Sequence, residues 1–312
     1  MPYQTGTATD VADLLDKLRV FASANGWTVN TWLNGWLSLQ SGSLYFNFMA
    51  DTAVGSDNRY AGPRVLVRGA TGFDSAQSFT TQPGTSPEAE ANDMPGPFAA
   101  YHFFVSADYI HVVVEVTAGI FTHFVAGLLQ KAGTYTGGEY VDAVQWTTSA
   151  SNGNPNYPDY SDNNLMFDQL TGYYSKEGYL HADIDGKTDN WFEFGTGGPA
   201  GNRARGVTRN SGASAGLLQA LWERSPNTFN GISPLLPIAV AVERSGALYS
   251  PAGVVQDLRL VNMAYLTPGQ TLTIGSDQWL CFPAKQKTDV WNQYGSNVPS
   301  SGYYGYAYRK VP

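Results

Sequence analysis

The segment Tyr101–Leu129 constrains the fold more than any other part of the chain, because it has the pattern of a β-hairpin. From position 110 to position 117, isoleucine and valine occupy every even position, whereas more polar side chains occupy most of the odd ones. A period of two predicts a strand with one buried face. Thr117-Ala118-Gly119 predicts the turn, since glycine accepts the positive φ of a tight reversal, and the second strand follows at 120–129.

An amphipathic helix is expected as the first element, followed by short strands. Apolar residues recur at helical spacing from Val11 to Phe21, Thr9 or Asp10 can cap the helix, and Asn25-Gly26 predicts its end. The period then changes to two, and turn residues divide the region that follows. The strands expected in this half span residues 27–29, 32–40, 43–50 and 65–67, with turns at Asn34-Gly35 and Ser41-Gly42.

The second half of the chain also reads as mainly strands. A segment rich in proline, asparagine and glycine, Thr147–Asn164, separates the two halves and predicts a boundary near residue 150. A second helix is predicted at Ala215–Arg224. The strands expected here span residues 178–183, 191–194, 238–242, 258–265, 271–274, 279–282 and 304–309. The predicted fold is mainly β, with two β-sandwich or barrel-like units, residues 1–150 and 151–312, an N-terminal α-helix and long irregular loops.

Three stretches of the sequence resemble one family of proteins. They are the hairpin YHFFVSADYIHVVVEVTAGIFTHFVAGLL, the N-terminal TGTATDVADLLDKLRVFASANGWTV, and the C-terminal LVNMAYLTPGQTLTIGSDQWLCFPAKQK with YYGYAYRKV. They resemble the valine-rich hairpin, the opening helix and first strand, and the closing aromatic strands of tail and baseplate proteins of tailed bacteriophages. The resemblance implies a structural component of the virion, made in the host cytoplasm. Its implied partners are other virion proteins and further copies of itself in a symmetric homo-oligomer.

Composition is compatible with such a role. Charged residues make up 14% of the 312 residues, whereas typical globular domains have about 25%. Neutral polar groups and tyrosine can be buried against another protein without the desolvation cost of unpaired charges. Extracellular enzymes and lectins share this bias, so the composition alone leaves those classes open.

Charge and hydropathy argue against two classes of partner. The net charge of −8 disfavours an extended phosphate-binding face, so we expect no nucleic-acid partner. No stretch approaches the roughly 20 apolar residues of a membrane-spanning helix, and no basic region precedes an apolar run at the N-terminus. We therefore expect no membrane insertion. Cys281 is the only cysteine, which excludes an intramolecular disulfide and predicts a small buried side chain beside Trp279.

Loops supply the candidate interface residues. The segment Gly69–Pro97 is long, polar and rich in proline, so it is either an arm that orders on a neighbouring subunit or a disordered surface loop. The glycine-rich segment around Arg203 is predicted to be an irregular loop, solvated or donating salt bridges to another subunit. The predicted interface residues are Phe73, Phe79, Tyr157, Tyr160, Arg203, Arg205 and Arg209.

Two clusters could bind a metal ion, although a structural role is favoured for both. Cross-strand pairing in the hairpin could bring His111 near His123, with Glu115 as a third transition-metal ligand. The motif HADIDGKTDNW carries Asp183, Asp185 and Asp189 around a glycine, as a Ca²⁺ loop requires, but it lacks the terminal glutamate of an EF-hand. A tight turn between strands is the favoured interpretation, and we expect no cofactor.

No enzyme signature is present among the motifs of the chain. It has no G-x-S-x-G elbow, P-loop, H-E-x-x-H or dinucleotide fingerprint, and a non-enzymatic role is favoured. Two alternatives remain: a carbohydrate-binding receptor-recognition module, and a glycan-degrading tail enzyme that would use Asp183, Asp185 or Glu193. The aromatic residues that could line a sugar cleft are Tyr173, Tyr174, Tyr179 and Trp191. The sequence does not distinguish neck, tube, baseplate and fibre attachment.

Overall fold

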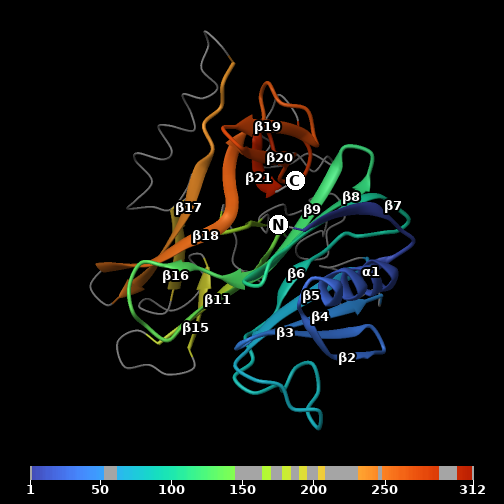
Figure 1. Cartoon of the computed structure of the whole chain (residues 1–312), viewed down its shortest axis with the longest axis vertical. Helices are drawn as coiled ribbons and strands as arrows, with labels where there is room; N and C mark the ends of the chain where they lie inside the picture. Colours follow the sequence, from blue (N-terminus) through green and yellow to red (C-terminus); the bar gives the residue numbers. More distant parts are fainter. Residues whose placement is uncertain are drawn as a thin grey trace, which may run out of the picture.

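The structure, a computed structural model, is mainly β with one α-helix among the residues it describes. Those residues are 2–52, 62–144, 164–169, 178–183, 190–194, 203–207, 231–244, 248–287 and 301–310. The strands form a 14-stranded sheet, a five-stranded sheet and a two-stranded ribbon, and almost every pairing is antiparallel. The predicted fold class of β-sandwich-like units with an N-terminal helix is confirmed (Figure 1).

The five-stranded sheet is a meander close to the predicted one. Its first turn contains Asn34 and Gly35, with φ values of 51° and 81°, and this pair of positive angles matches the right-handed twist of the flanking strands. The strand order is β2-β3-β4-β5-β6. The strands are β2 (Thr28–Leu33), β3 (Trp36–Ser41), β4 (Leu44–Asp51), β5 (Arg64–Ala70) and β6 (Ala89–Ala91).

The larger sheet contains strands from both halves of the chain. Its order is β1-β7-β8-β9-β11-β14-β15-β16-β17-β18-β21-β20-β19, with β10 paired to β18. The first strands are β1 (Tyr3–Ala8), β7 (Phe98–Val105), β8 (Tyr109–Thr117), β9 (Ile120–Leu128), β10 (Gln130–Lys131) and β11 (Gly137–Ala143). The others are β14 (Tyr179–Ala182), β15 (Trp191–Phe194), β16 (Arg203–Val207), β17 (Leu236–Arg244), β18 (Leu248–Asn262), β19 (Gln270–Ile274), β20 (Asp277–Pro283) and β21 (Tyr304–Lys310). The ribbon pairs β12 (Asn164–Leu165) with β13 (Asp168–Gln169).

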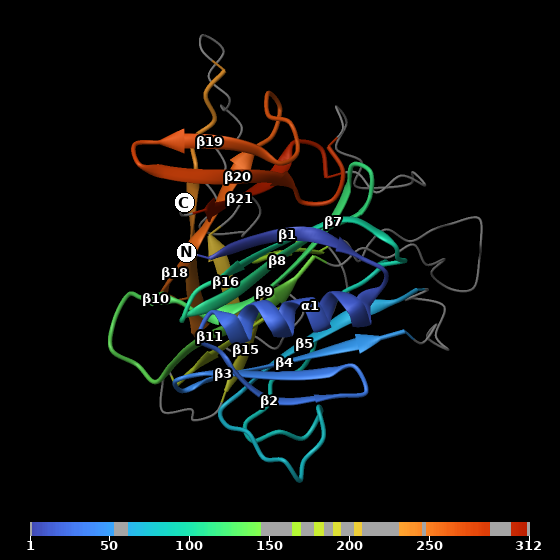
Figure 2. The ribbon, with the colours of Figure 1, turned by 45° about the vertical axis from the view of Figure 1, so that its right-hand side comes forward.

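Helix α1 (Val11–Ala24) begins and ends as predicted. The Asp10 side chain accepts hydrogen bonds from the backbone N–H groups of Ala12 and Asp13, which are otherwise unpaired in the first turn. Gly26 follows the C-terminus with a φ of 94°. The buried face of α1 packs against β1, β7 and the five-stranded sheet (Figure 2).

The hairpin β8–β9 lies in the middle of the molecule. One face of β8 packs with α1 and the five-stranded sheet, and the other face packs with β17, β18, β20 and β21. Its even and odd positions are therefore both buried, including His111 and Val113. The prediction of a half-buried hairpin is wrong, because a second layer covers the face that carries the polar residues.

Two further predictions are corrected by pairing between distant segments. A strand, β1, precedes the helix and pairs with β7, although the helix was expected to be the first element. The residues Arg203–Val207, expected to lie in an irregular loop, form β16 and pair with β17. The predicted helix Ala215–Arg224 and most of the linker Thr147–Asn164 lie outside the described residues. The boundary near residue 150 stays a prediction, and the large sheet joins strands from both sides of it.

Candidate assembly interface

The polar face of the central hairpin holds a cluster of histidine and tyrosine side chains. In the hairpin register Val113 lies opposite His123 and His111 opposite Val125, so the two histidines share a face. The ring of Tyr308 lies 6.0 Å from that of His111 and 5.8 Å from that of His123. The predicted proximity of the histidines is confirmed, with a tyrosine of β21 beside both.

Hydrogen bonds within the protein occupy most of this cluster. His123 Nε2 lies 2.9 Å from the carbonyl oxygen of Pro283 and must donate to it, so Nδ1 accepts from the Tyr308 hydroxyl at 2.7 Å. His111 Nε2 lies 2.8 Å from the hydroxyl oxygen of Tyr140. These bonds connect β9 to β20 and β21, and β8 to β11.

Burial keeps these imidazoles neutral. Desolvation lowers the pKa of His111 and of His123 to about 3, and that of His102 to about 4. Glu115 is separately engaged, since its Oε1 accepts from the Gly119 backbone N–H at 2.8 Å. Across the described ranges, no three His, Cys, Asp or Glu residues gather as metal ligands would. The cluster acts as a polar cross-link between layers.

The fourth histidine, His181, lies near the predicted sugar-binding aromatics. His181 Nδ1 lies 2.8 Å from Glu139 Oε2, and its ring lies 5.2 Å from that of Trp191. Trp191 is only 8% exposed, since it covers Gly69 and donates from Nε1 to the carbonyl oxygen of Gly84 at 2.8 Å. Tyr179 is buried to the same extent. These two side chains are core residues and form no exposed shelf, while Tyr173 and Tyr174 lie outside the described residues.

The candidate calcium ligands are described only in part. The Asp183 backbone N–H donates to the carbonyl oxygen of Thr136 at 2.8 Å, at the end of β14. Asp185 and Asp189 lie outside the described residues, so the calcium site stays a prediction. Glu193, the third candidate acid of the glycan-cleaving alternative, lies opposite Tyr179 in the β14–β15 register and is half-buried.

Asp142 on β11 carries a deeply buried carboxyl group. Desolvation raises its pKa to about 8, although backbone N–H groups of Phe167, Ala143 and Gly178 donate to it and favour the charged form. A Cβ on Gly178 would overlap this carboxyl group, so glycine is required there. Asp142 thus holds three chain segments together.

A buried lysine also bridges the two halves of the chain. Lys285 Nζ is fully buried, has no hydrogen-bond partner within 3.5 Å among the described residues, and lies 3.7 Å from Asp93 Oδ2. Desolvation lowers the pKa of Lys285, and Asp93 opposes that shift. The pair joins the segment after β6 to the end of β20.

The segment Gly69–Pro97 is ordered on its own chain. The amide of Gln82 accepts from the Asp74 backbone N–H and donates to carbonyl groups within the same loop, and β6 pairs with β5. Phe79 is 5% exposed and packs under the Arg68 guanidinium, so it is corrected from an interface residue to an internal one. Phe73 is half-buried with its ring 6.3 Å from that of Trp36.

The remaining predicted interface residues are not placed in full. Arg203 and Arg205 lie on β16, where the backbone is described but their side chains are not. Tyr157, Tyr160 and Arg209 lie outside the described residues. Their assignment to an interface stays a prediction.

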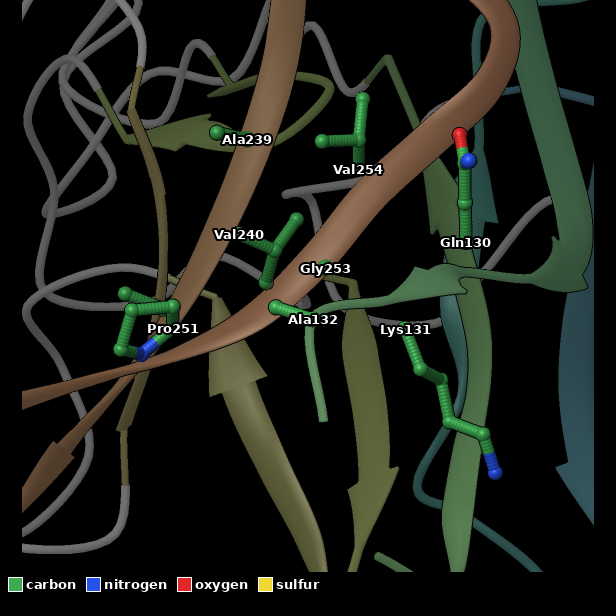
Figure 3. A pocket seen from close by; sticks show the side chains of 9 residues that line it. Gln130, Lys131, Ala132, Ala239, Val240, Pro251, Gly253 and Val254 are labelled. Atoms are coloured by element: carbon green, nitrogen blue, oxygen red, sulfur yellow. The ribbon is translucent and has the colours of Figure 1, made fainter. Parts of the chain in front are cut away.

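A shallow pocket of about 480 Å³ lies where β10 meets β17 and β18 (Figure 3). Its lining is mostly apolar, with Ala239, Val240 and Pro251 on one side. Lys131 points away from these residues and donates to the carbonyl oxygens of Tyr135 and Gly137 at 2.9 and 3.3 Å. The pocket therefore has little polar chemistry with which to orient a small ligand.

Exposed apolar side chains mark other surfaces, which the sequence analysis missed. Leu33 ends β2, and Ile274 ends β19; these are the terminal strands of the five-stranded and 14-stranded sheets. Tyr265 precedes β19, and a Cβ at Gly231 would contact it, so it neighbours the exposed Ile232. Alternation places side chains on sheet faces but does not reveal which strand lies at an edge.

No protein-family model matches this chain, and no curated protein matches it significantly. In the part of the chain described by the structure, no helix is both long and apolar enough to cross a membrane.

Proposed function

We propose that this protein is a structural component of a tailed-phage virion, in the tail or baseplate, and that it acts by protein–protein assembly. The observation that carries the proposal is the exposed apolar surface at the sheet edges and the adjoining loop. Leu33, Ile274, Tyr265 and Ile232 are each more than half exposed. Burial of such groups against a partner is favourable, at about 25 cal/mol per Å² of apolar surface.

The interior supports the same role. The four histidines all make hydrogen bonds inside the protein, and in three of them burial lowers the pKa far enough to keep the ring neutral. The bonds of His123 join β9 to the distant strands β20 and β21, and the other three join strands that lie close together in the large sheet. A rigid multilayered scaffold that presents its sheet edges suits a subunit whose work is contact with neighbours.

Gold-labelled antibodies against the purified chain test this proposal. We expect label at the tail or baseplate of tailed particles released from cells that carry the gene, and none on particles from cells with the gene deleted. A chain that stays in the supernatant when particles are sedimented, with unlabelled particles, would contradict the proposal.

Two further assays separate the alternatives. Saturable binding of the isolated chain to host cells would favour receptor recognition. Release of reducing sugar from host polysaccharide, abolished by Asp183→Asn or Glu193→Gln in folded protein, would favour a glycan-degrading enzyme.

A further inference from the structure

We propose that β19 pairs with β19 of a second copy across a twofold axis, which extends the outer strands of the large sheet from one copy into the next. This inference rests on the proposed assembly function and names one partner and one surface for it. The partner is another molecule of this chain, and the surface is the outer edge of Gln270–Ile274.

β19 is a terminal strand without the usual protection. It is the last strand of the large sheet, pairs only with β20 among the described strands, and has no buried residue. Soluble proteins protect such edges with lysine, proline or β-bulges, because unpaired backbone groups recruit other strands. The sequence QTLTI has no charge and no proline, and its register with β20 is continuous.

The other terminal strands are protected. The pairing of β2 is irregular between Val29 and Thr31, which bends that edge. β6 has three residues, all buried. β1 lies between α1 and the paired strands β20 and β21, with Lys310 Nζ 4.8 Å from the ring centroid of Tyr3 (Figure 2). Of the strands that end the two larger sheets, β19 is thus the one without such protection in the described chain.

The sequence of β19 is self-complementary, and this identifies the occupant as a second copy. An antiparallel twofold pairing centred on Leu272 places Thr271 of each copy opposite Thr273 of the other, a favourable pair in sheets. No like charges meet across the axis, as they would if the strand carried a lysine. The same axis brings the two Leu272 side chains together. Ile274, which is 54% exposed in the monomer, becomes partly buried against the second copy. Isologous twofold contacts are the commonest form of homo-oligomer.

Sedimentation velocity of the full chain, from about 10 μM to about 1 mM, tests the pairing, since one short edge supports only a weak interface. We expect a concentration-dependent dimer. Thr273→Lys places two lysines at the contact and weakens dimerisation by about tenfold or more. Val20→Lys is the matched control, since Val20 is 55% exposed on α1, and this variant dimerises as the wild type does. Circular dichroism confirms that both variants fold.

Disulfide trapping tests the register. The native Cys281 is buried, so an introduced cysteine supplies the accessible thiol. Leu272→Cys lies on the twofold axis and forms a covalent dimer on mild oxidation, whereas Thr273→Cys faces Thr271 of the other copy and links more slowly. Equal rates of linkage for the two variants would overturn the register.

A wild-type chain that stays monomeric at about 1 mM, or equal loss of dimer in the Val20 and Thr273 variants, would overturn self-pairing. Neither result affects the antibody labelling of particles, which tests the proposed function by itself. Failure of the labelling with an intact dimer would reject the virion role and retain the twofold contact.

Discussion

The hairpins β8–β9 and β19–β20 have similar local designs and opposite environments. Each has alternating residues and a two-residue turn with a glycine at positive φ, Gly119 at 79° and Gly275 at 63°. Layers cover both faces of β8–β9, whereas β19 forms an edge with exposed residues. Local pattern thus specifies a hairpin, and its neighbours decide whether it serves the core or a surface.

We expect the largest effect from a fall in pH, which should destabilise the hairpin β8–β9 through His111 and His123 more than the hairpin β19–β20. The folded pKa of about 3 for His111 and for His123 lies below the unfolded value near 6.5, so the folded state binds fewer protons. The stability that neutral His111 and His123 contribute to the fold is complete above pH 6.5. It is lost as the pH falls from 6.5 to about 3. We expect a loss of about 3 kcal/mol per histidine at pH 4.5.

Urea unfolding of wild type and His123→Gln between pH 7 and pH 4.5 measures this loss. The variant should lose less stability on acidification, and subtracting the two curves removes the opposite contribution of Asp142, whose raised pKa gives stability that falls as the pH rises toward 8. Parallel curves would mean that His123 is not a buried neutral group.

Removal of a core side chain from the central hairpin should have the next largest effect. Phe124 on β9 is fully buried, with its ring 6.0 Å from that of Phe48 in the facing sheet. Phe124→Ala leaves a cavity between layers, and we expect a loss of about 3–5 kcal/mol in the free energy of unfolding by urea. A loss below about 1 kcal/mol would show that the two sheets do not pack through β9.

Addition of a methyl group tests how closely the hairpin is packed. A Cβ at Gly127 would lie 2.5 Å from Tyr109 Cβ and 2.7 Å from the Tyr140 hydroxyl oxygen. We expect Gly127→Ala to lower the melting temperature, with a loss of about 1–3 kcal/mol. Gly133→Ala is the control, because nothing lies within 4 Å of its Cβ position, and its melting temperature should be close to that of wild type. Equal falls in the melting temperatures of the two variants would contradict the closer packing around Gly127.

A substitution in the edge hairpin β19–β20 should change the stability of the monomer least. Ile274→Ala removes an exposed side chain, so we expect a change within about 0.5 kcal/mol in the stability of the monomer in dilute solution. Urea unfolding at low micromolar concentration measures it. A loss comparable to that of Phe124→Ala would mean that β19 is covered within its own chain.

The predictable parts of the fold are those with strong local signals. Periodicity and turn residues predicted α1, β4, the hairpin β8–β9 and the strands β19–β21 close to their observed bounds. They placed β2, β3, β5 and β17 less closely, and they missed the first ten residues of β18, which begins at Leu248 and not at Leu258. β6 and β11 were not predicted. β1 and β16 were missed too, since their short sequences, YQTGTA and RARGV, have no clear alternation. They are strands because β7 and β17 offer them backbone partners.

The functional surfaces were less predictable than the elements. The hairpin pattern predicted that His111 and His123 lie close together, since hairpin register follows from the turn, but it did not predict that Tyr308 lies beside both. Phe79 was assigned to an interface because its loop is polar and rich in proline, yet it is buried, with the Arg68 guanidinium over its ring. Exposure depends on residues distant in the sequence, which a local pattern does not contain.

Residue period and turn geometry were sufficient to predict a mainly β chain with a capped N-terminal helix and a central valine-rich hairpin, because they act over a few neighbouring positions. The burial of β8–β9 on both faces and the position of β19 at an edge follow from tertiary packing instead. The order of strands in a sheet depends on which distant segments pair and pack together, and those contacts determine which side chains remain for a partner.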